Sequence, residues 1–120
     1  MPSPSFLSVH KFGGAALADG AAIRHVAGLV DRCRATPLMI TASAMATVTN
    51  TLFDIAIRAV ADDLAVGIAR LDALRHQHLA AWAEACGSNE PPAELTALFA
   101  DAEGRLRAVA DAKALEPTVL

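Results

Sequence analysis

Two short segments with strand character flank an amphipathic helical segment within the first 42 residues. Residues 6–12 alternate apolar and polar side chains and run into Gly13-Gly14, as a strand does before a tight turn. The segment Leu38–Ala42 is a short apolar run that begins after a proline, which is typical of a buried strand. Strand, helix and strand in this order predict a βαβ unit with parallel strands and a right-handed crossover. The sequence therefore predicts the α/β fold class.

Helical periodicity follows each predicted strand. Apolar residues recur at intervals of three and four from Leu17 onward, until the Thr-Pro pair at residues 36–37 ends this first helix. A second helix begins near residues 49–50, where Thr49 or Asn50 is suited to be the N-cap. The first half of the chain is thus predicted to be βαβα.

A long helical hairpin is predicted for the second half. An apolar stripe runs from Leu64 to Cys86 and ends at Gly87, which suits the position just after a helix. A proline-containing turn at residues 88–92 precedes another apolar stripe, which is broken near residues 116–117. Two long helices joined by a short turn should pack as an antiparallel pair.

The length of 120 residues suffices for one hydrophobic core, so one domain is predicted. We expect residues 1–120 to be a single partial domain. Residues 1–61 would be its βαβα half, and residues 62–120 its helical hairpin. Two parallel strands alone leave both sheet edges unpaired, so the chain looks like the beginning of a larger α/β domain.

Charge and composition argue against several functional classes. Ten basic and thirteen acidic residues give a net charge of −3 without a basic, aromatic patch, so nucleic-acid binding is not expected. The longest uncharged stretch, residues 35–53, contains many polar side chains, so membrane insertion is not expected. Cys33 and Cys86 are far apart, and His76 and His78 point to different sides of a helix, so no metal site is predicted. With no secretory segment, we expect a cytoplasmic protein.

Chemically useful residues follow both predicted strands. Lys11 stands just before Gly13 and Gly14, and an ammonium beside bare amides and a helix N-terminus suits phosphate binding. Ser43 and Thr49 follow the second strand and could donate hydrogen bonds to a carboxylate. Each motif alone has a structural alternative. The glycines can form a simple turn beside a solvated lysine, and the hydroxyls can belong to a helix cap.

Two ordered motifs resemble signatures of the aspartate kinases. Residues 9–14 (VHKFGG) resemble the opening signature of that family, Lys-Phe-Gly-Gly-Thr-Ser. Residues 43–45 (SAM) and 48–50 (VTN) are similar to its second signature. The similarity extends over most of the chain, at residues 17–20, 23–27 and 71–75 and at His78. Two signatures in the right order are more specific than either one alone.

The resemblance implies a three-layer αβα sandwich of the amino acid kinase (carbamate kinase-like) type, present here as its N-terminal portion. It also implies ATP-dependent phosphorylation of the L-aspartate side chain to 4-phospho-L-aspartate, the first step toward lysine, threonine and methionine. Mg²⁺ would accompany the ATP. The partners would be L-aspartate and ATP, and the chain would form a homo-oligomer or associate with the remainder of the kinase.

The resemblance assigns roles to five residues. Lys11 would be catalytic, neutralising charge on the transferring phosphoryl group. Gly13 and Gly14 would cradle phosphate oxygens, and Ser43 and Thr49 would hold the aspartate. These roles agree with the general chemistry, because phosphoryl transfer needs positioning and electrostatic stabilisation rather than a protein nucleophile.

Three departures from the family pattern leave alternatives open. Alanines at residues 15–16 replace the usual Thr-Ser, which removes two hydroxyls near the phosphates. Acetylglutamate kinases share the fold and can carry small residues there, but their second loop is rich in glycine and residues 43–50 contain none. The acidic and nucleotide-binding segments of the family have no counterpart in these 120 residues. We therefore expect the N-terminal part of a catalytic domain, which needs the rest of the domain for turnover; the alternative is a non-catalytic interaction module.

Overall fold

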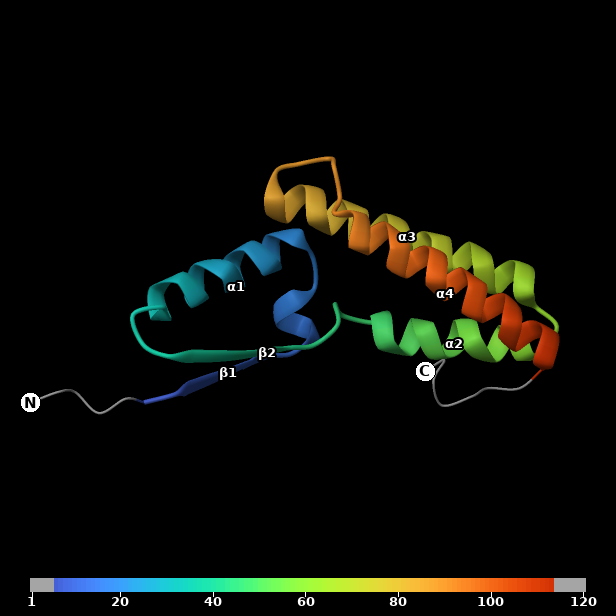
Figure 1. Cartoon of the computed structure of the whole chain (residues 1–120), viewed down its shortest axis with the longest axis horizontal. Coiled ribbons are helices and arrows are strands. Elements are labelled where there is room, and N and C mark those ends of the chain that lie inside the picture. The colour runs from blue at the N-terminus through green and yellow to red at the C-terminus, as the bar shows by residue number, and fades with distance from the viewer. Residues whose placement is uncertain (1–5, 114–120) are drawn as a thin grey trace, which may run out of the picture.

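The computed structural model describes residues 6–113, which form a mixed α/β fold (Figure 1). Two strands, one 3₁₀ turn and four helices occur in this part of the chain. They are β1 (Ser8–Phe12), η1 (Gly14–Leu17), α1 (Gly20–Cys33), β2 (Leu38–Ala42), α2 (Val48–Val60), α3 (Leu64–Cys86) and α4 (Ala93–Ala112). The predicted α/β class is confirmed, and so is the order of its elements.

The strands β1 and β2 form a parallel pair connected through α1, as the βαβ prediction requires. The register pairs Ser8 with Leu38 and Phe12 with Ala42. β1 begins at Ser8, two residues later than predicted, because its first bond across the pair runs from the Ser8 amide to the Pro37 carbonyl, 3.0 Å away. Pro37 has no amide to continue the ladder in the other direction.

The helix α1 begins at Gly20 rather than at Leu17. Leu17 belongs to the 3₁₀ turn η1, where its side chain is buried. The Asp19 carboxylate then accepts a 2.8 Å hydrogen bond from the Ala22 amide and caps α1. This cap satisfies one of the free amides at the helix start, so it determines where α1 begins.

The helices α2, α3 and α4 pack side by side, each antiparallel to the one before it in the chain (Figure 1). The main core lies among them and includes Met45, Val48, Ile55, Ala59, Leu71, Leu74, Ala81, Leu106 and Val109. The hairpin of α3 and α4 confirms the prediction for the second half. Gly87 ends α3 at φ 67°, a left-handed conformation that favours glycine.

Aromatic side chains tie the two helices of the hairpin together. The Trp82 indole donates a 3.0 Å hydrogen bond to the Glu90 carbonyl in the connecting turn. The Phe99 ring meets His78 edge to face, with centroids 5.1 Å apart. The predicted break at residues 116–117 lies outside the described residues.

The predicted N-cap of α2 is wrong. The helix begins at Val48, and its N-cap is Thr47 rather than Thr49 or Asn50. Val48 is buried in the main core, so packing moves the helix start two or three residues toward the sheet. Thr47 has φ 70°, and its side chain makes no capping hydrogen bond.

The molecule is elongated, with the sheet and α1 at one end and the helical bundle at the other (Figure 1). Its extents are 65 × 31 × 24 Å and its radius of gyration is 17.9 Å. A compact domain of this length has a radius of gyration of about 13–14 Å. Within residues 6–113, α1 lies along one face of a two-stranded sheet, and none of the helices has the length and hydropathy of a membrane span.

Candidate functional site

The loops that follow β1 and β2 lie at the same edge of the sheet. The register places Lys11 beside Thr41 and Phe12 beside Ala42. One residue further on, the Ser43 amide donates a 3.0 Å hydrogen bond to the Phe12 carbonyl. The carboxyl ends of parallel strands are where ligands bind in open α/β sheets. This edge is therefore the candidate site.

The glycine pair brings the first loop against the second. A Cβ on Gly14 would lie 3.4 Å from the Ala46 Cα and 3.6 Å from the Ala44 carbonyl oxygen. Gly13, by contrast, has no atom within 4 Å of the position of a Cβ, and its φ of −82° is open to any residue. The fold therefore does not explain a glycine at position 13, whereas a bulky oxyanion approaching the backbone there would.

Each loop is anchored by one buried side chain. Leu17 anchors the η1 turn, and Met45 belongs to the main core. The Ser43 hydroxyl is exposed and donates a 2.8 Å hydrogen bond to the Ala44 carbonyl, which leaves its oxygen able to accept. The buried side chains of Leu17 and Met45 thus fix the two loops that carry the polar groups of this edge.

The α2 N-terminus supplies amides to this edge. The Val48 amide donates to the Met45 carbonyl and the Thr51 amide to the Thr47 carbonyl. Between them, the amides of Thr49 and Asn50 have no backbone or side-chain acceptor among residues 6–113. Unpaired amides and the helix dipole together favour an anion at this helix end.

The Lys11 side chain is exposed, and no acidic group of the described chain pairs with it. It shares with Val9 the more exposed face of β1, whereas the alternate residues are half-buried. An ammonium without a carboxylate partner keeps its charge available to an incoming anion.

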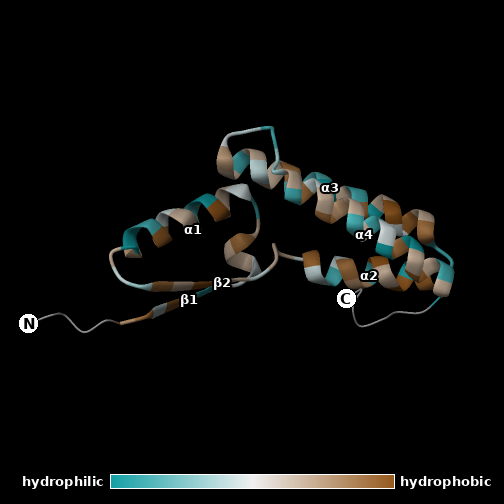
Figure 2. Ribbon diagram, viewed as in Figure 1, coloured by the Kyte–Doolittle hydropathy of each residue, from teal (hydrophilic) through white to brown (hydrophobic). Residues whose placement is uncertain are grey.

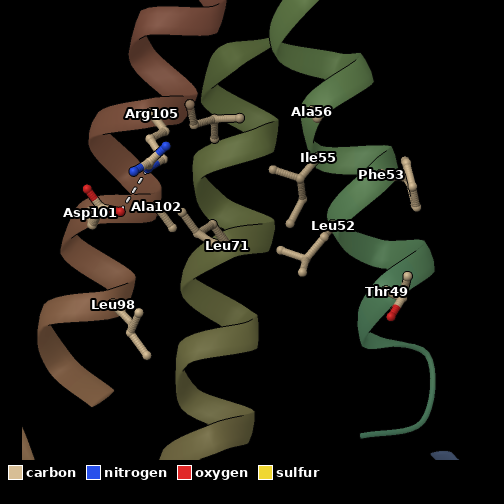
Figure 3. Close-up of a pocket in the computed structure, with 11 residues that line it drawn as sticks. Thr49, Leu52, Phe53, Ile55, Ala56, Leu71, Leu98, Asp101, Ala102 and Arg105 are labelled. Atoms are coloured by element: carbon tan, nitrogen blue, oxygen red, sulfur yellow. Dashed lines mark hydrogen bonds and ion pairs between the residues drawn. The ribbon is translucent and has the colours of Figure 1, made fainter. Parts of the chain in front are cut away.

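Thr49 lies at the start of α2 and lines a groove between α2 and α4 (Figure 3). The structure therefore places Lys11, Gly13, Gly14 and Ser43 in or directly after the adjacent carboxyl ends of β1 and β2. The Thr49 amide belongs to the α2 N-terminus beside this edge, whereas its side chain lines the helical groove.

The groove itself was not anticipated from the sequence. It has a volume of about 420 Å³ and a mostly apolar lining, with Leu71 of α3 among the residues that form it. Leu52 points into it from α2 and Leu98 contributes from α4, where an ion pair joins Asp101 and Arg105 at 2.8 Å (Figure 3). Its only signal in the sequence is the spacing of Leu98 and Asp101, which places an apolar and a charged residue on the same side of α4.

No protein-family model matches this chain, and no curated protein matches it significantly. The functional proposal therefore depends on the chemistry of the sheet edge. A cation, two glycine amides, a hydroxyl and a helix N-terminus can bind an oxyanion and stabilise charge on it.

Sequence reasoning missed two parts of this edge. The first is which amides are free. A helix N-terminus near Thr49 was expected to offer free amides to an anion, but because the helix begins at Val48 these amides are those of residues 49–50. The second is Thr47, a β-branched residue in the left-handed region. No pattern of residue types signals a threonine in that conformation, since threonine disfavours it.

Proposed function

We propose that this chain provides the phosphate-binding edge of an amino acid kinase catalytic domain of the aspartate kinase type. The domain would transfer the γ-phosphoryl group of Mg-ATP to the side-chain carboxylate of L-aspartate. A carboxylate oxygen forms the new bond to phosphorus while the bond to the β-phosphate oxygen breaks. The products are 4-phospho-L-aspartate and ADP.

The observation that carries the proposal is the contact between the two signature loops. They are separated by some thirty positions in sequence, yet Gly14 lies against the backbone of Ala44 and Ala46. The end of β1 and the loop after it carry Lys11 and the glycine pair, which suit phosphate binding. The loop after β2 carries the Ser43 hydroxyl and leads into the N-terminus of α2. This arrangement supports two anionic substrates meeting at one edge.

The roles of the residues follow from their chemistry. The Lys11 ammonium would offset negative charge on the transferring phosphoryl group, and the amides of Gly13 and Gly14 would bind its oxygens. Ser43 and the α2 N-terminus would hold the aspartate carboxylates, with Thr49 contributing its amide. No group of three or more His, Cys, Asp or Glu residues is gathered for a metal within residues 6–113, so Mg²⁺ would enter with the nucleotide.

The three-layer sandwich remains part of the proposal. Further strands beside β1 and helices on the open face of the sheet would complete it, and the exposed apolar residues Val9 and Met39 on that face support this completion. An acetylglutamate kinase would use the same phosphate edge with a different acceptor. The choice of acceptor distinguishes the two enzymes.

The test is nucleotide binding and turnover by the chain, alone and supplemented with a complementing kinase segment. Mg-ATP should raise the melting temperature, and L-aspartate should stimulate ADP release where acetylglutamate does not. Lys11→Met should abolish both effects. Lys113→Met is the matched control, because it removes the same charge from the far end of the molecule, where that lysine pairs with Asp62.

Absence of both a melting shift and turnover, in either form of the protein, would refute the kinase proposal. Equal loss in Lys11→Met and Lys113→Met would show that net charge rather than position matters, and would refute the role of Lys11.

A second candidate is a non-catalytic interaction module. Unpaired sheet edges and the exposed side chains of Val9, Met39, Phe53 and Leu98 favour it. It predicts self-association with no effect of Mg-ATP on the melting temperature.

A further inference from the structure

The composition of β2 does not match its surroundings. Leu38–Ala42 contains no charged residue, and such a run is typical of a strand buried within a sheet. Here β2 is an edge strand, and Met39 and Ile40 are 51% and 45% exposed. Figure 2 shows the hydrophobic colouring of this strand. Charges, prolines and bulges normally protect an edge strand from pairing, and β2 has none within its bounds.

The backbone of β2 offers its outer edge a regular set of hydrogen-bonding groups. Ser8 donates to Pro37, and Ser43 donates to Phe12, so the odd-numbered residues of β2 face β1. Because strand residues alternate in direction, Leu38, Ile40 and Ala42 turn their amides and carbonyls outward. No other strand of the described chain pairs with these groups.

The outer edge of β1 is less suited to pairing with a copy of itself. Its outward residues include Lys11, and a lysine on an edge strand discourages association. Pairing two β1 strands about Lys11 would bring like charges together, and pairing them about His10 would bring two imidazoles together. β2 carries no such obstacle.

We propose that two copies of this chain associate through antiparallel pairing of their β2 strands, with Ile40 on the two-fold axis. Ile40 then exchanges both backbone hydrogen bonds with Ile40 of the other copy. Leu38 pairs in the same way with Ala42 of the other copy. Every outward amide and carbonyl of both strands finds a partner in this register.

The side chains agree with this register. Met39 of each copy faces Thr41 of the other, and the two Ile40 side chains lie together, so the contacts are apolar or β-branched. The result is a four-stranded sheet, β1–β2–β2–β1, with β1 and its Lys11 at both outer edges. The contact is isologous, as closed dimers usually are. It uses no side chain of the candidate anion site, so it stands apart from the proposed kinase activity.

The pairing surface is short, so the dimer should depend on concentration. Light scattering on the full chain should give a mass that rises from monomer to dimer between micromolar and millimolar protein. Ile40→Lys should keep the mass at monomer, because it places like charges face to face on the axis. Val9→Lys is the matched control on the outer edge of β1, and it should dimerise as the wild type does.

Amide hydrogen exchange tests the register without a mutation. The Ile40 amide should exchange about as fast as an unpaired amide in dilute protein and at least tenfold more slowly in concentrated protein. The outward amides of Val9 and Lys11 should exchange equally fast in both. If circular dichroism shows that Ile40→Lys fails to fold, this measurement on the wild type still tests the pairing of the β2 strands.

A monomeric mass at every concentration would overturn the proposal, and so would a dimer that Ile40→Lys leaves intact. Protection of Ile40 that appears only on addition of a different protein would assign the edge to another partner. Equal loss of the dimer in Ile40→Lys and Val9→Lys would overturn the assignment to β2.

Discussion

Gly20 lies directly against the backbone of Ala81. A Cβ at Gly20 would be 2.7 Å from the Ala81 carbonyl oxygen and 2.6 Å from the Glu84 Cβ. The start of α1 and the C-terminal part of α3 meet at this point, so the sheet end of the molecule is joined to the helical bundle through a contact that no side chain can enter.

Gly20→Ala should therefore destabilise the protein. The methyl group must push α1 away from α3, and overpacking of this kind costs about 1–3 kcal/mol. Urea unfolding would measure the change. Gly28→Ala is the matched control within the same helix, because its Cβ meets no atom within 4 Å. The free energy of unfolding of Gly28→Ala should rise by about 0.8–1 kcal/mol, because alanine has the higher helix propensity. A stabilised Gly20→Ala would contradict the close approach.

Thr47→Gly should stabilise the protein. Thr47 has φ 70°, where a Cβ costs roughly 1–2 kcal/mol, and glycine avoids that cost while losing about 0.5–1 kcal/mol to chain entropy. A net gain of up to about 1.5 kcal/mol in the free energy of unfolding is expected in thermal unfolding. Thr51→Gly should instead destabilise the protein, because Thr51 is helical and its hydroxyl donates a 2.8 Å hydrogen bond to the Thr47 carbonyl. Destabilisation by both substitutions would show that Thr47 is unstrained.

Stability should fall in acid through loss of the Asp54 charge. The hydrogen bond from Arg58, together with the charges of Arg58 and Arg70, holds the pKa of Asp54 below its ordinary value, despite an opposing effect of desolvation. Arg70 lies on α3, so this carboxylate links α2 to α3. Because the pKa is lower in the folded than in the unfolded chain, the stabilisation is complete above about pH 4 and declines as the pH falls below it.

Asp54→Asn should flatten the pH dependence of the free energy of unfolding below about pH 4. The Asp72 carboxylate also has a lowered pKa, chiefly through its hydrogen bond from Arg75, but that pair lies within α3. Asp72→Asn should therefore leave the association of α2 with α3 unchanged. Unaltered acid sensitivity in Asp54→Asn would show that other carboxylates govern this range.

Leu106→Ala should lower the free energy of unfolding by about 2–5 kcal/mol, because Leu106 is 4% exposed in the core where α4 meets α2 and α3. Leu98→Ala, on the same helix but 65% exposed, should change the free energy of unfolding by less than about 0.5 kcal/mol. Chemical denaturation with matched protein concentrations would compare the two. Similar costs at both positions would contradict the observed orientation of α4.

Local patterns predict the elements of this fold well. Pro37 and the apolar run after it define β2, and Gly87 marks the end of α3, because each of these residues acts through its own backbone chemistry. The parallel pairing of β1 and β2 also follows, since the short crossover through α1 permits it.

The arrangement of those elements is harder to predict. Whether α2 covers the sheet or joins the hairpin depends on which apolar face finds the larger partner, and the packing of Ile55 and Leu106 decides in favour of the hairpin. The same packing moves the start of α2 to Val48, which changes the amides available at the candidate site. Gly20 gives no local sign of its contact with α3, because that contact joins residues sixty positions apart.

The elongated form has a consequence for any measurement of size. A particle 65 Å long and 24–31 Å across experiences more frictional drag than a sphere of equal mass. A single copy should therefore diffuse like a heavier, rounder particle and sediment more slowly than a sphere of its own mass. Pairing through β2 would lengthen it further, so the frictional ratio, which compares the drag with that of a sphere of equal mass, should rise on dimerisation rather than fall.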